Sequence, residues 1–513
     1  MAFTTIHTKK DGKKYVYSVE SYWDKEKKAP RNKQVCLGRL DEETGEVVPS
    51  SRKTNQEDFA PGITAKTMTI GPSAILEKIA RDSGLESILK RSFPNTWQQI
   101  LSLSFFLVQK GLPLSRCETW SVSNKHPFGE AISSQYVSKL LAAINKDDQQ
   151  RFFSLWMKRL AENENFFYDI TSVSSYSEQN EFVRLGYNRD NENLPQINLA
   201  LIFGQNSKLP AFFRTLPGSI SDVSTLQNTV SLLDYIGQSK LTFILDRGFY
   251  RKVNLDMLFE ARYSFVLKIP RRKWVEALYD EYHDSIVSPQ NRYVVGENEV
   301  LYAVTKLHKW NGRRCYAHIY YNNVMAADVA NAFMLKLMVW KQELESGNQK
   351  TANQWAYEKY FHVKETPKRG RKVLEKSEAV HKAINQYAGF SCIISTKKMD
   401  AVAALDIYRK KELVENSFDD LKNSLDMKRL RIHSSSSMDS RLFIQFIALI
   451  LLSAVRNTKI QHEKLRYLTI REIMEAMEVI SEVHFSGRYG KITTEAAPIQ
   501  RIIMEAFGIA WTT

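Results

Sequence analysis

The feature that most constrains the fold is a change of hydrophobic pattern at Phe166. From there to Pro270 the chain carries three consecutive strand-like segments, followed by alternating helix-like and strand-like segments. One strand-like segment, Leu241–Asp246, begins with a near-continuous apolar run, which is typical of a strand covered on both faces of a sheet. A chain with this alternation is expected to form a layered α/β domain.

The order of these segments predicts a particular α/β domain. Three strands in a meander, then helix, strand, helix and strand, is the order of an RNase H-like core. Residues 271–388 interrupt the order with further strand-like pieces, a helix pattern and a basic loop. We therefore expect an RNase H-like α/β core, residues 165–270 and 389–455, interrupted by a β-rich insertion domain at 271–388.

The flanking segments carry different patterns. Residues 1–60 are charged, with short strand-like runs, and predict a small β-rich N-terminal region. Residues 61–164 place apolar side chains at three- and four-residue steps, which predicts a helical region that either binds DNA or only packs. Residues 456–513 predict a helical C-terminal tail. The apolar run Leu442–Val455 is shorter than the ~20 residues of a membrane helix and is interpreted as a core helix.

The composition favours an anionic partner. Lys and Arg number 72 against 57 Asp and Glu, a net charge of +15. Nucleic acid is the first candidate, because Lys and Arg contacts with phosphate release counterions, although a basic enzyme is the plainer alternative. The four cysteines have no CxxC spacing, so neither a zinc knuckle nor a disulfide framework is expected. The N-terminus has no apolar secretory segment, and a cytosolic setting fits.

Two aspartates end predicted strands. Asp169 ends the first strand of the core and Asp246 ends the central one. Carboxylates at the ends of adjacent strands can share a divalent cation, and Mg²⁺ prefers such oxygen ligands. The alternative is that each aspartate only caps the turn after it. The predicted strand order favours the shared metal site.

A predicted helix from about Val402 to Leu425 carries a third group of candidates. Its polar stripe beside the apolar face comprises Tyr408, Lys411, Glu415 and Lys422. A carboxylate between lysines and a tyrosine suits a site that binds metal and phosphate together. The alternative is a solvated face in which Lys411 and Glu415 form an i,i+4 pair.

Together these motifs resemble those of the DDE transposases of the insertion sequence four group. That group carries a signature of Tyr, two residues, Arg, three residues, Glu, six residues and Lys. In this chain the signature positions are Tyr408, Lys411, Glu415 and Lys422. Lys411 replaces the Arg, which keeps the charge but loses the bidentate fork for phosphate. The family's other two carboxylates match Asp169 in YDITS and Asp246 in LDRGFY, and the resemblance covers about residues 165–455.

The resemblance implies metal-dependent cut-and-paste transposition. Two Mg²⁺ ions, with Mn²⁺ as a substitute, would be held by Asp169, Asp246 and Glu415 and would activate the attacking water or 3′-hydroxyl. The reaction would cleave the 3′ ends, form and resolve hairpins, and transfer strands. The implied partners are double-stranded DNA, as terminal inverted repeats and target, and a second copy of the chain in the DNA complex. The implied location is the cytoplasm of a prokaryote, at the nucleoid, with no membrane partner.

The resemblance also implies residues that hold DNA. Tyr408, Lys411 and Lys422 would hold phosphates near the cut, and a tryptophan of the insertion would stack on a flipped base. Trp274 is the first candidate and Trp310 the second, with packing as the alternative for both. The expected DNA-contacting residues are Tyr408, Lys411, Lys422, Arg247, Arg271, Arg272, Lys273 and Trp274. Basic stretches at 364–372 and 428–431 are either phosphate contacts or solvated loops.

Two other functions remain open on the sequence. One is an RNase H-fold DNA nuclease without strand transfer, which the insertion and the polar stripe argue against. The other is a non-catalytic DNA-binding protein derived from a transposase, for which the replacement at Lys411 is the one hint. Other acidic residues near the motifs rank lower because they lack a strand end or stripe context: Asp190, Asp222 and Asp419.

Overall fold

The computed structural model shows a chain of two compact units. The first comprises Met1–Ala65 and Phe485–Tyr489, and the second comprises Lys66–His484 and Gly490–Thr513. The described residues are 2–10, 12–24, 29–41, 45–49, 65–161, 164–177, 180–190, 192–220, 222–235, 241–296, 299–366, 370–430, 432, 434–486 and 490–510. Parts of several predicted segments lie outside them, among them residues 50–64 around the first boundary, 367–369 of one basic stretch, and 431 of the other.

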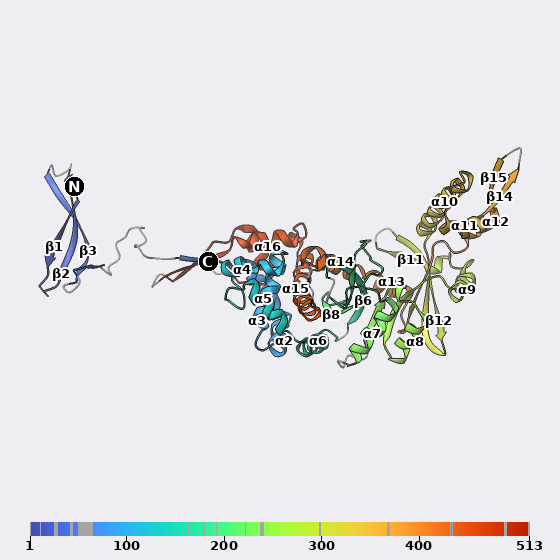
Figure 1. The fold of residues 1–513 in the computed structure, drawn as a ribbon, viewed down its shortest axis with the longest axis horizontal. Helices are drawn as coiled ribbons and strands as arrows, with labels where there is room; N and C mark the ends of the chain where they lie inside the picture. The colour runs from blue at the N-terminus through green and yellow to red at the C-terminus, as the bar shows by residue number, and fades with distance from the viewer. Residues whose placement is uncertain are drawn as a thin grey trace. The chain divides into compact units, whose positions relative to one another are not determined.

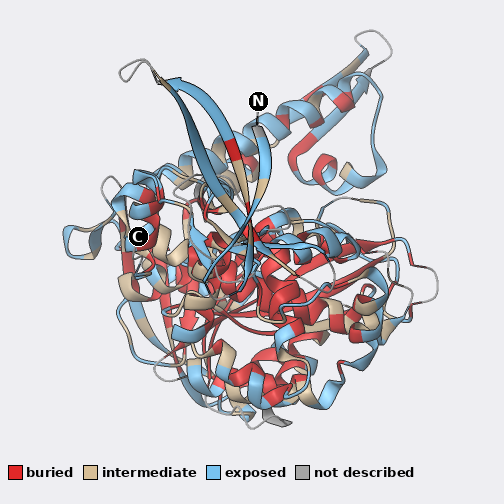
Figure 2. Ribbon diagram, turned by 90° about the vertical axis from the view of Figure 1, so that its left-hand side faces the viewer, coloured by how far each residue is buried: buried red, intermediate tan, exposed pale blue. Residues whose placement is uncertain are grey.

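The first unit is an antiparallel meander. Its strands are β1 (Ala2–Thr8), β2 (Lys14–Asp24), β3 (Ala29–Leu40) and β4 (Val47–Pro49), in the order β1-β2-β3-β4. Among the described residues of these strands, Val16 and Val19 are buried apolar side chains. Figure 2 shows these strands largely exposed, whereas buried residues are concentrated in the interior of the second unit.

Helices dominate the N-terminal part of the second unit. They are α1 (Gly71–Asp82), α2 (Leu85–Ser92), α3 (Trp97–Lys110), α4 (Cys117–Ser123), α5 (Ser134–Ala143) and α6 (Lys146–Leu160), with a 3-10 turn η1 (Leu114–Arg116). They pack around α15 (Ser435–Gln461), where Phe443 meets the rings of Phe93 and Phe152. The α15 helix is long and apolar enough to cross a membrane, but 83% of its apolar window is buried in the protein. It is therefore a core helix.

The C-terminal tail is mixed. Helices α16 (Ile470–Glu478) and α17 (Pro498–Ala506) flank two strands, β18 (Ser481–Phe485) and β19 (Lys491–Thr493). The two strands join β5 (Ala65–Thr69) in a three-stranded sheet of order β19-β18-β5.

The α/β core has its elements in the predicted order. They are β6 (Asn165–Ser175), β7 (Gln196–Gly204), β8 (Pro210–Pro217), α7 (Asp222–Tyr235), β9 (Thr242–Leu245), α8 (Lys252–Glu260) and β10 (Ser264–Ile269), and β16 (Phe390–Ser395) follows the interruption. Strand β9 is central, parallel to both β6 and β10. All four of its residues are buried, as its apolar run predicted.

The interrupting segment differs from a single β-rich domain. Its strands β11 (Arg292–Val295), β12 (Glu299–Trp310) and β13 (Arg313–Tyr321) pair through β16 and extend the central sheet, whose order is β11-β12-β13-β16-β10-β9-β6-β7-β8. Helix α9 (Lys273–Tyr282) precedes these strands. The pairing joins segments about 70 positions apart, so local hydrophobic pattern does not reveal it.

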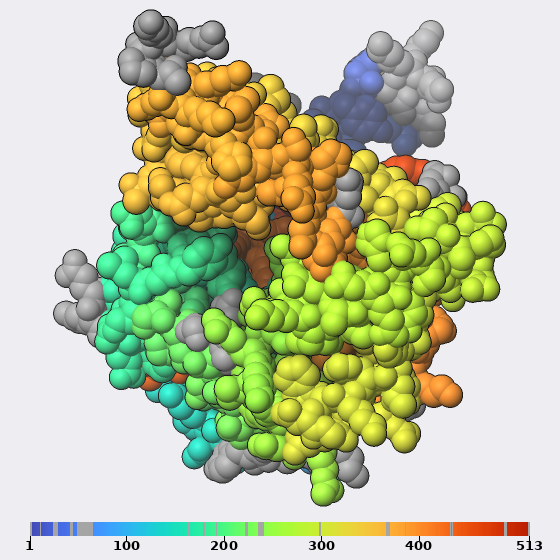
Figure 3. All heavy atoms as spheres, turned by 90° about the vertical axis from the view of Figure 1, so that its right-hand side faces the viewer, coloured from blue at the N-terminus to red at the C-terminus, as the bar shows by residue number. Residues whose placement is uncertain are grey.

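The rest of this segment forms a lobe of its own, visible in Figures 1 and 3. Its elements are α10 (Asn323–Glu345), α11 (Gln354–Tyr360), β14 (Phe361–Thr366), β15 (Gly370–Glu375) and α12 (Ser377–Asn385). It has a separate apolar cluster around Leu337, Trp340 and Tyr357.

The predicted helix from Val402 to Leu425 is wrong as a single element. The structure has α13 (Ala401–Arg409), α14 (Glu412–Asp419) and a π turn η5 (Asp420–Ser424). At the joint the amides donate three residues back instead of four: Lys411 N–H to the Tyr408 carbonyl, and Val414 N–H to the Lys411 carbonyl. The helix therefore tightens and restarts, although lysines are good helix formers.

Candidate functional site

The two candidate aspartates lie next to each other, but only Asp246 follows the end of a strand. Asp169 lies within β6 (Asn165–Ser175), so the prediction that it ends the first strand is wrong. Tyr168 of β6 pairs with Leu245 of β9 in parallel register, and Asp169 and Asp246 are the next residues along each strand. Neighbouring strands are about 4.8 Å apart, so both carboxylates emerge at one point of the sheet. They line a small pocket together with Tyr408 and Lys411. The structure thus brings together two predicted carboxylates, one predicted hydroxyl group and one predicted ammonium group.

Both aspartates accept a hydrogen bond from the next backbone amide, but only Asp246 caps a turn. Asp246 Oδ1 accepts a hydrogen bond from Arg247 N–H at 2.7 Å, at the start of the 3-10 turn Arg247–Phe249. Asp169 Oδ1 accepts from Ile170 N–H at 2.8 Å. The capping alternative is therefore present for Asp246 but not for Asp169, after which β6 continues. For Asp246 the cap uses only part of the carboxylate's capacity, since a carboxylate can accept about four hydrogen bonds.

Asp246 receives further donors from the α13–α14 joint. The Tyr408 hydroxyl donates to Asp246 Oδ1 at 2.6 Å. The Lys411 ammonium lies 3.3 Å from Asp246 Oδ2. Burial would raise the pKa of Asp246, but the bonds from Tyr408, Arg247 N–H and Lys411 outweigh it and leave that pKa below its ordinary value. Asp246 is thus held as an anion.

The pKa of Asp169 is shifted in the opposite direction to that of Asp246. Burial raises its pKa to about 6, and the Ile170 amide and the Lys411 charge only partly oppose the rise. The neighbouring Asp246 charge raises it further. A buried carboxyl group with a raised pKa beside a second carboxylate is a frequent feature of functional sites.

Glu415 lies at the edge of this arrangement. Its Oε1 is 3.0 Å from the Lys411 ammonium, and its side chain is 53% exposed. Lys411 therefore links Glu415 to Asp246, and Glu415 does not line the pocket. Within the part of the chain that the structure describes, no three His, Cys, Asp or Glu side chains are grouped closely enough to hold a metal ion.

The donor set nevertheless fits a cation. The oxygens of Asp169 and Asp246 are hard ligands of the kind that Mg²⁺ and Mn²⁺ bind. The Lys411 ammonium already lies between the carboxylates of Asp246 and Glu415. Asp169 and Asp246 are thus the residues placed to hold a metal, and Glu415 can join them only if its contact with Lys411 changes.

Lys422, the last residue of the stripe, lies elsewhere. Its ammonium is 2.8 Å and 2.6 Å from the two oxygens of Asp190, and the Lys422 side chain is only 12% exposed. Asp190, ranked low on the sequence, is thus the partner of a signature lysine. The break in the helix at Lys411 and the π turn change the direction of the stripe, so its four members do not share one site.

The remaining predicted DNA contacts surround the pocket unequally. Arg247 is exposed directly after Asp246, and Lys273 is exposed at the start of α9. Arg271 forms an ion pair with Glu276, and Arg272 lies over the ring of Tyr250.

Both candidate tryptophans are engaged in packing. Trp274 Nε1–H donates to the Tyr250 hydroxyl at 2.9 Å, and its ring stacks on His308. Trp310 Nε1–H donates to Asp256 Oδ1 at 2.8 Å. One face of the Trp274 ring is therefore already covered.

Sequence reasoning missed Lys268. It lies on β10, and its ammonium is 5.4 Å from the ring centre of Tyr408. Burial lowers its pKa, while the Asp246 charge opposes the change. The available signal was a lysine inside the apolar strand FVLKI, next to the central strand that ends in Asp246.

Comparison with known protein families shows the family to which this chain belongs. The family model described as a transposase DDE domain matches residues 163–451, more than half of the chain. No curated protein matches. Among solved structures, the chain is similar to one in a cryo-EM structure of the piggyBac transposase synaptic complex with hairpin DNA. The identity is 10% and the TM-score 0.36, over 80% of this chain and 77% of that one, so no residue correspondence is taken from it.

Proposed function

Because the chain belongs to the DDE transposase domain family, we propose that it performs cut-and-paste DNA transposition as a member of the insertion sequence four group. The observation that supports this is the pocket in which Asp169 and Asp246 meet Tyr408 and Lys411. The proposed reaction is cleavage at the 3′ ends, hairpin formation and resolution, and strand transfer. Its substrates are terminal inverted repeats and target DNA, in a complex with two copies of the chain, at the nucleoid of a prokaryotic cytoplasm.

The proposed catalytic residues are Asp169, Asp246 and Glu415. Asp169 and Asp246 would hold divalent cations, Mg²⁺ or Mn²⁺, and Glu415 would complete the set after leaving Lys411. The metal supplies activation of the attacking oxygen and charge stabilisation of the leaving oxygen. Tyr408 orients Asp246 through its hydroxyl, which frees the remaining lone pairs of that carboxylate for a cation.

The cations around the pocket would hold the substrate phosphate. Lys411 is one third exposed and reaches the pocket, so it is placed to exchange its carboxylate contacts for a phosphate oxygen. Arg247 is exposed beside the pocket and would contact the adjoining phosphate. Lys422 is bound to Asp190, so we assign it to positioning of the loop around residue 190.

A nicking assay tests this function. The substrate is the DNA that borders the gene at its source, incubated with Mg²⁺ or Mn²⁺. We expect nicks at fixed positions with the wild type, none with Asp246→Asn, and normal nicking with Asp147→Asn, the same substitution at an exposed surface position. Nicking by Asp246→Asn at the wild-type rate would show that this pocket is not the active site. Joined products that carry both element ends and target DNA distinguish a transposase from a simple nuclease.

One observation favours a second candidate, a non-catalytic DNA-binding protein derived from a transposase. Glu415 is bound to Lys411, and the described residues hold no cluster of three carboxylates. The same assay separates the two functions. Binding of the border DNA without any nick under either metal supports the second candidate.

A further inference from the structure

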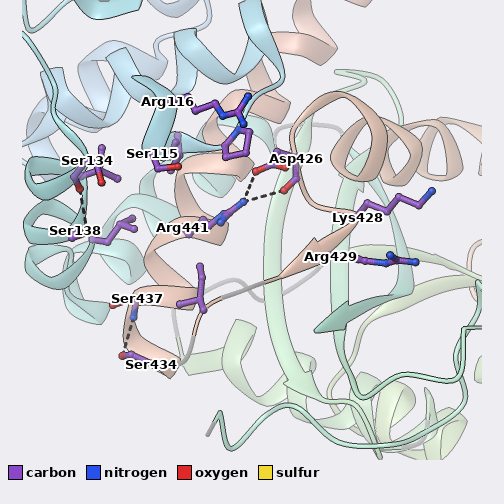
Figure 4. Close-up of a pocket in the computed structure, with 15 residues that line it drawn as sticks. Ser115, Arg116, Ser134, Ser138, Asp426, Lys428, Arg429, Ser434, Ser437 and Arg441 are labelled. Atoms are coloured by element: carbon purple, nitrogen blue, oxygen red, sulfur yellow. Dashed lines mark hydrogen bonds and ion pairs between the residues drawn. The ribbon is translucent and has the colours of Figure 1, made fainter. Parts of the chain in front are cut away.

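A large groove lies outside the candidate active site, in the second unit. Its volume is about 950 Å³. One wall comes from η1 and α5 of the helical region, and the other from the segment after the π turn and the start of α15. Figure 4 shows Ser134 and Ser138 on one wall and Ser434 and Ser437 on the other, with Arg441 of α15 pointing toward Asp426.

The groove is positively charged. Its lining includes four cations and one acid: Arg116, Lys428, Arg429, Arg441 and Asp426. Arg441 Nη2–H donates to Asp426 Oδ2 at 2.6 Å, so the one acid is already neutralised. Arg429 pairs with Glu192 at 2.8 Å. Arg116 and Lys428 are exposed, and within the described residues neither forms an ion pair.

Two helices begin at this groove. Ser133 caps α5 by accepting from Tyr136 N–H, and Ser434 caps α15 by accepting from Ser437 N–H. The first amides of a helix carry partial positive charge, and the serine hydroxyls can donate to an anion. Unpaired cations, hydroxyls and helix starts on both walls are the groups that phosphodiesters use on proteins. A groove of this volume has room for an extended ligand and not only for a single small anion.

The groove lies along the same strand as the candidate active site. Strand β17 (Arg429–Leu430) pairs in parallel with β6 at Ser174 and Ser175. Strand β9 pairs with the earlier part of β6, and Asp246 follows it directly. From Asp169 to Ser174 is five strand positions, about 17 Å at ~3.3 Å per residue. Along a duplex that distance corresponds to roughly five nucleotides at 3.4 Å each.

We propose that this groove binds the sugar–phosphate backbone of double-stranded DNA, roughly five nucleotides from the phosphate at the active site. Arg116 and Lys428 contact phosphates at its rim, while the serines and helix starts of α5 and α15 bind the backbone inside. The contact is to backbone only, so it is independent of base sequence. Its distance from the cut rests on the proposed function, but the binding itself does not.

The test is the salt dependence of binding by the full chain. The probe is a 40-base-pair duplex of arbitrary sequence, followed by fluorescence anisotropy. The slope of log K against log salt falls by about 0.9 for each lost phosphate contact. We expect Arg116→Gln with Lys428→Gln to reduce the slope by about 1.8. The matched control removes two exposed lysines outside the groove, Lys139→Gln with Lys158→Gln, and is expected to leave the slope unchanged.

Three results overturn the inference. The first is an unchanged slope in the groove variant. The second is an equal reduction in the control, which would mean a general charge effect. The third is an equal reduction of the slope when the probe is a single-stranded RNA of the same length, which would exclude a site specific for duplex DNA. If the groove variant binds DNA as the wild type does and the wild type still nicks DNA, this inference is wrong and the proposed function is unaffected. If the groove variant has a reduced slope but the wild type never nicks DNA, this inference is supported and the proposed function is wrong.

Discussion

The hydrogen bond from Tyr408 to Asp246 gives the most direct test of the site. The hydroxyl donates to a charged acceptor at 2.6 Å, and the tyrosine is buried. Hydrogen bonds to charged groups contribute about 1.5–3 kcal/mol. Because 35% of the Asp246 side chain is exposed, solvent screening places the value near the lower end. Tyr408→Phe removes this bond and keeps the ring.

We expect Tyr408→Phe to slow metal-dependent nicking by about tenfold, which is ~1.4 kcal/mol in activation free energy. The substitution frees Asp246 to rotate and raises its pKa toward the ordinary value, so the carboxylate is less well held for a cation. Affinity for DNA should not change, because the hydroxyl is directed at Asp246. The measurement is single-turnover nicking at pH 7.5 beside an anisotropy titration of the same DNA.

Tyr467→Phe is the matched control. That side chain is 91% exposed, so its hydroxyl has no such role and nicking should be unaffected. If Tyr408→Phe nicks as fast as this control, the bond does not orient Asp246 and the reasoning fails. If it loses DNA affinity in proportion to rate, Tyr408 holds substrate and not the carboxylate.

Three further predictions concern the same elements. Burial raises the pKa of Asp169 to about 6, so folding favours its neutral form, and this contribution to stability is full below pH ~4 and lost as the pH rises through 6. Asp169→Asn should therefore raise the free energy of unfolding of the metal-free protein at pH 7.5 by at most about 3 kcal/mol, and with it the thermal midpoint. An unchanged midpoint at both pH 4 and pH 7.5 counts against this. Lys411→Gln should slow nicking at least about tenfold. Lys411→Arg should nick at the wild-type rate or faster, since guanidinium keeps the charge and adds a bidentate fork for phosphate. Equal nicking rates for the two variants contradict this. Asp190→Asn should lower the thermal midpoint, because Lys422, whose side chain is only 12% exposed, loses its carboxylate partner. Adding Lys422→Met should recover most of this loss. No recovery of the thermal midpoint means that Asp190 acts through another contact.

Local pattern was enough to predict the centre of the fold. The apolar run before Asp246 predicted a strand buried on both faces, and β9 is such a strand. The meander before it predicted that β6 lies beside β9, which is why Asp169 and Asp246 could be expected at one point. The first inference depends on hydrophobicity, which the sequence displays directly. The second joins segments 77 positions apart and depends on the RNase H-like order of the elements.

Features set by distant contacts were not predictable in this way. The pairing of β13 with β16 depends on register between segments far apart, so the insertion was expected as a separate β-rich domain. The break at Lys411 occurs where Tyr408 and Lys411 bind Asp246, which lies more than 160 positions earlier. Helix propensity favours an unbroken helix there, and the tertiary bonds override it. The partner of Lys422 was missed for the same reason, because Asp190 lies in a loop of irregular structure.

The charge balance of the pocket links these observations to the proposed chemistry. Asp169, Asp246 and Glu415 together could carry three negative charges, and Lys411 is the cation in contact with two of them. Burial raises the pKa of Asp169, the charge of Lys411 opposes this rise in part, and the charge of Asp246 adds to it. A divalent cation beside Asp169 and Asp246 would offset their negative charges more fully than one ammonium, and it would favour the ionised form of Asp169. Lys411 would then be free to bind the substrate phosphate, which explains why a long, flexible cation is tolerated at this position. Binding of Mn²⁺ should therefore release protons between pH 5 and 7, and a titration without proton release in that range contradicts the assignment of Asp169 as a ligand.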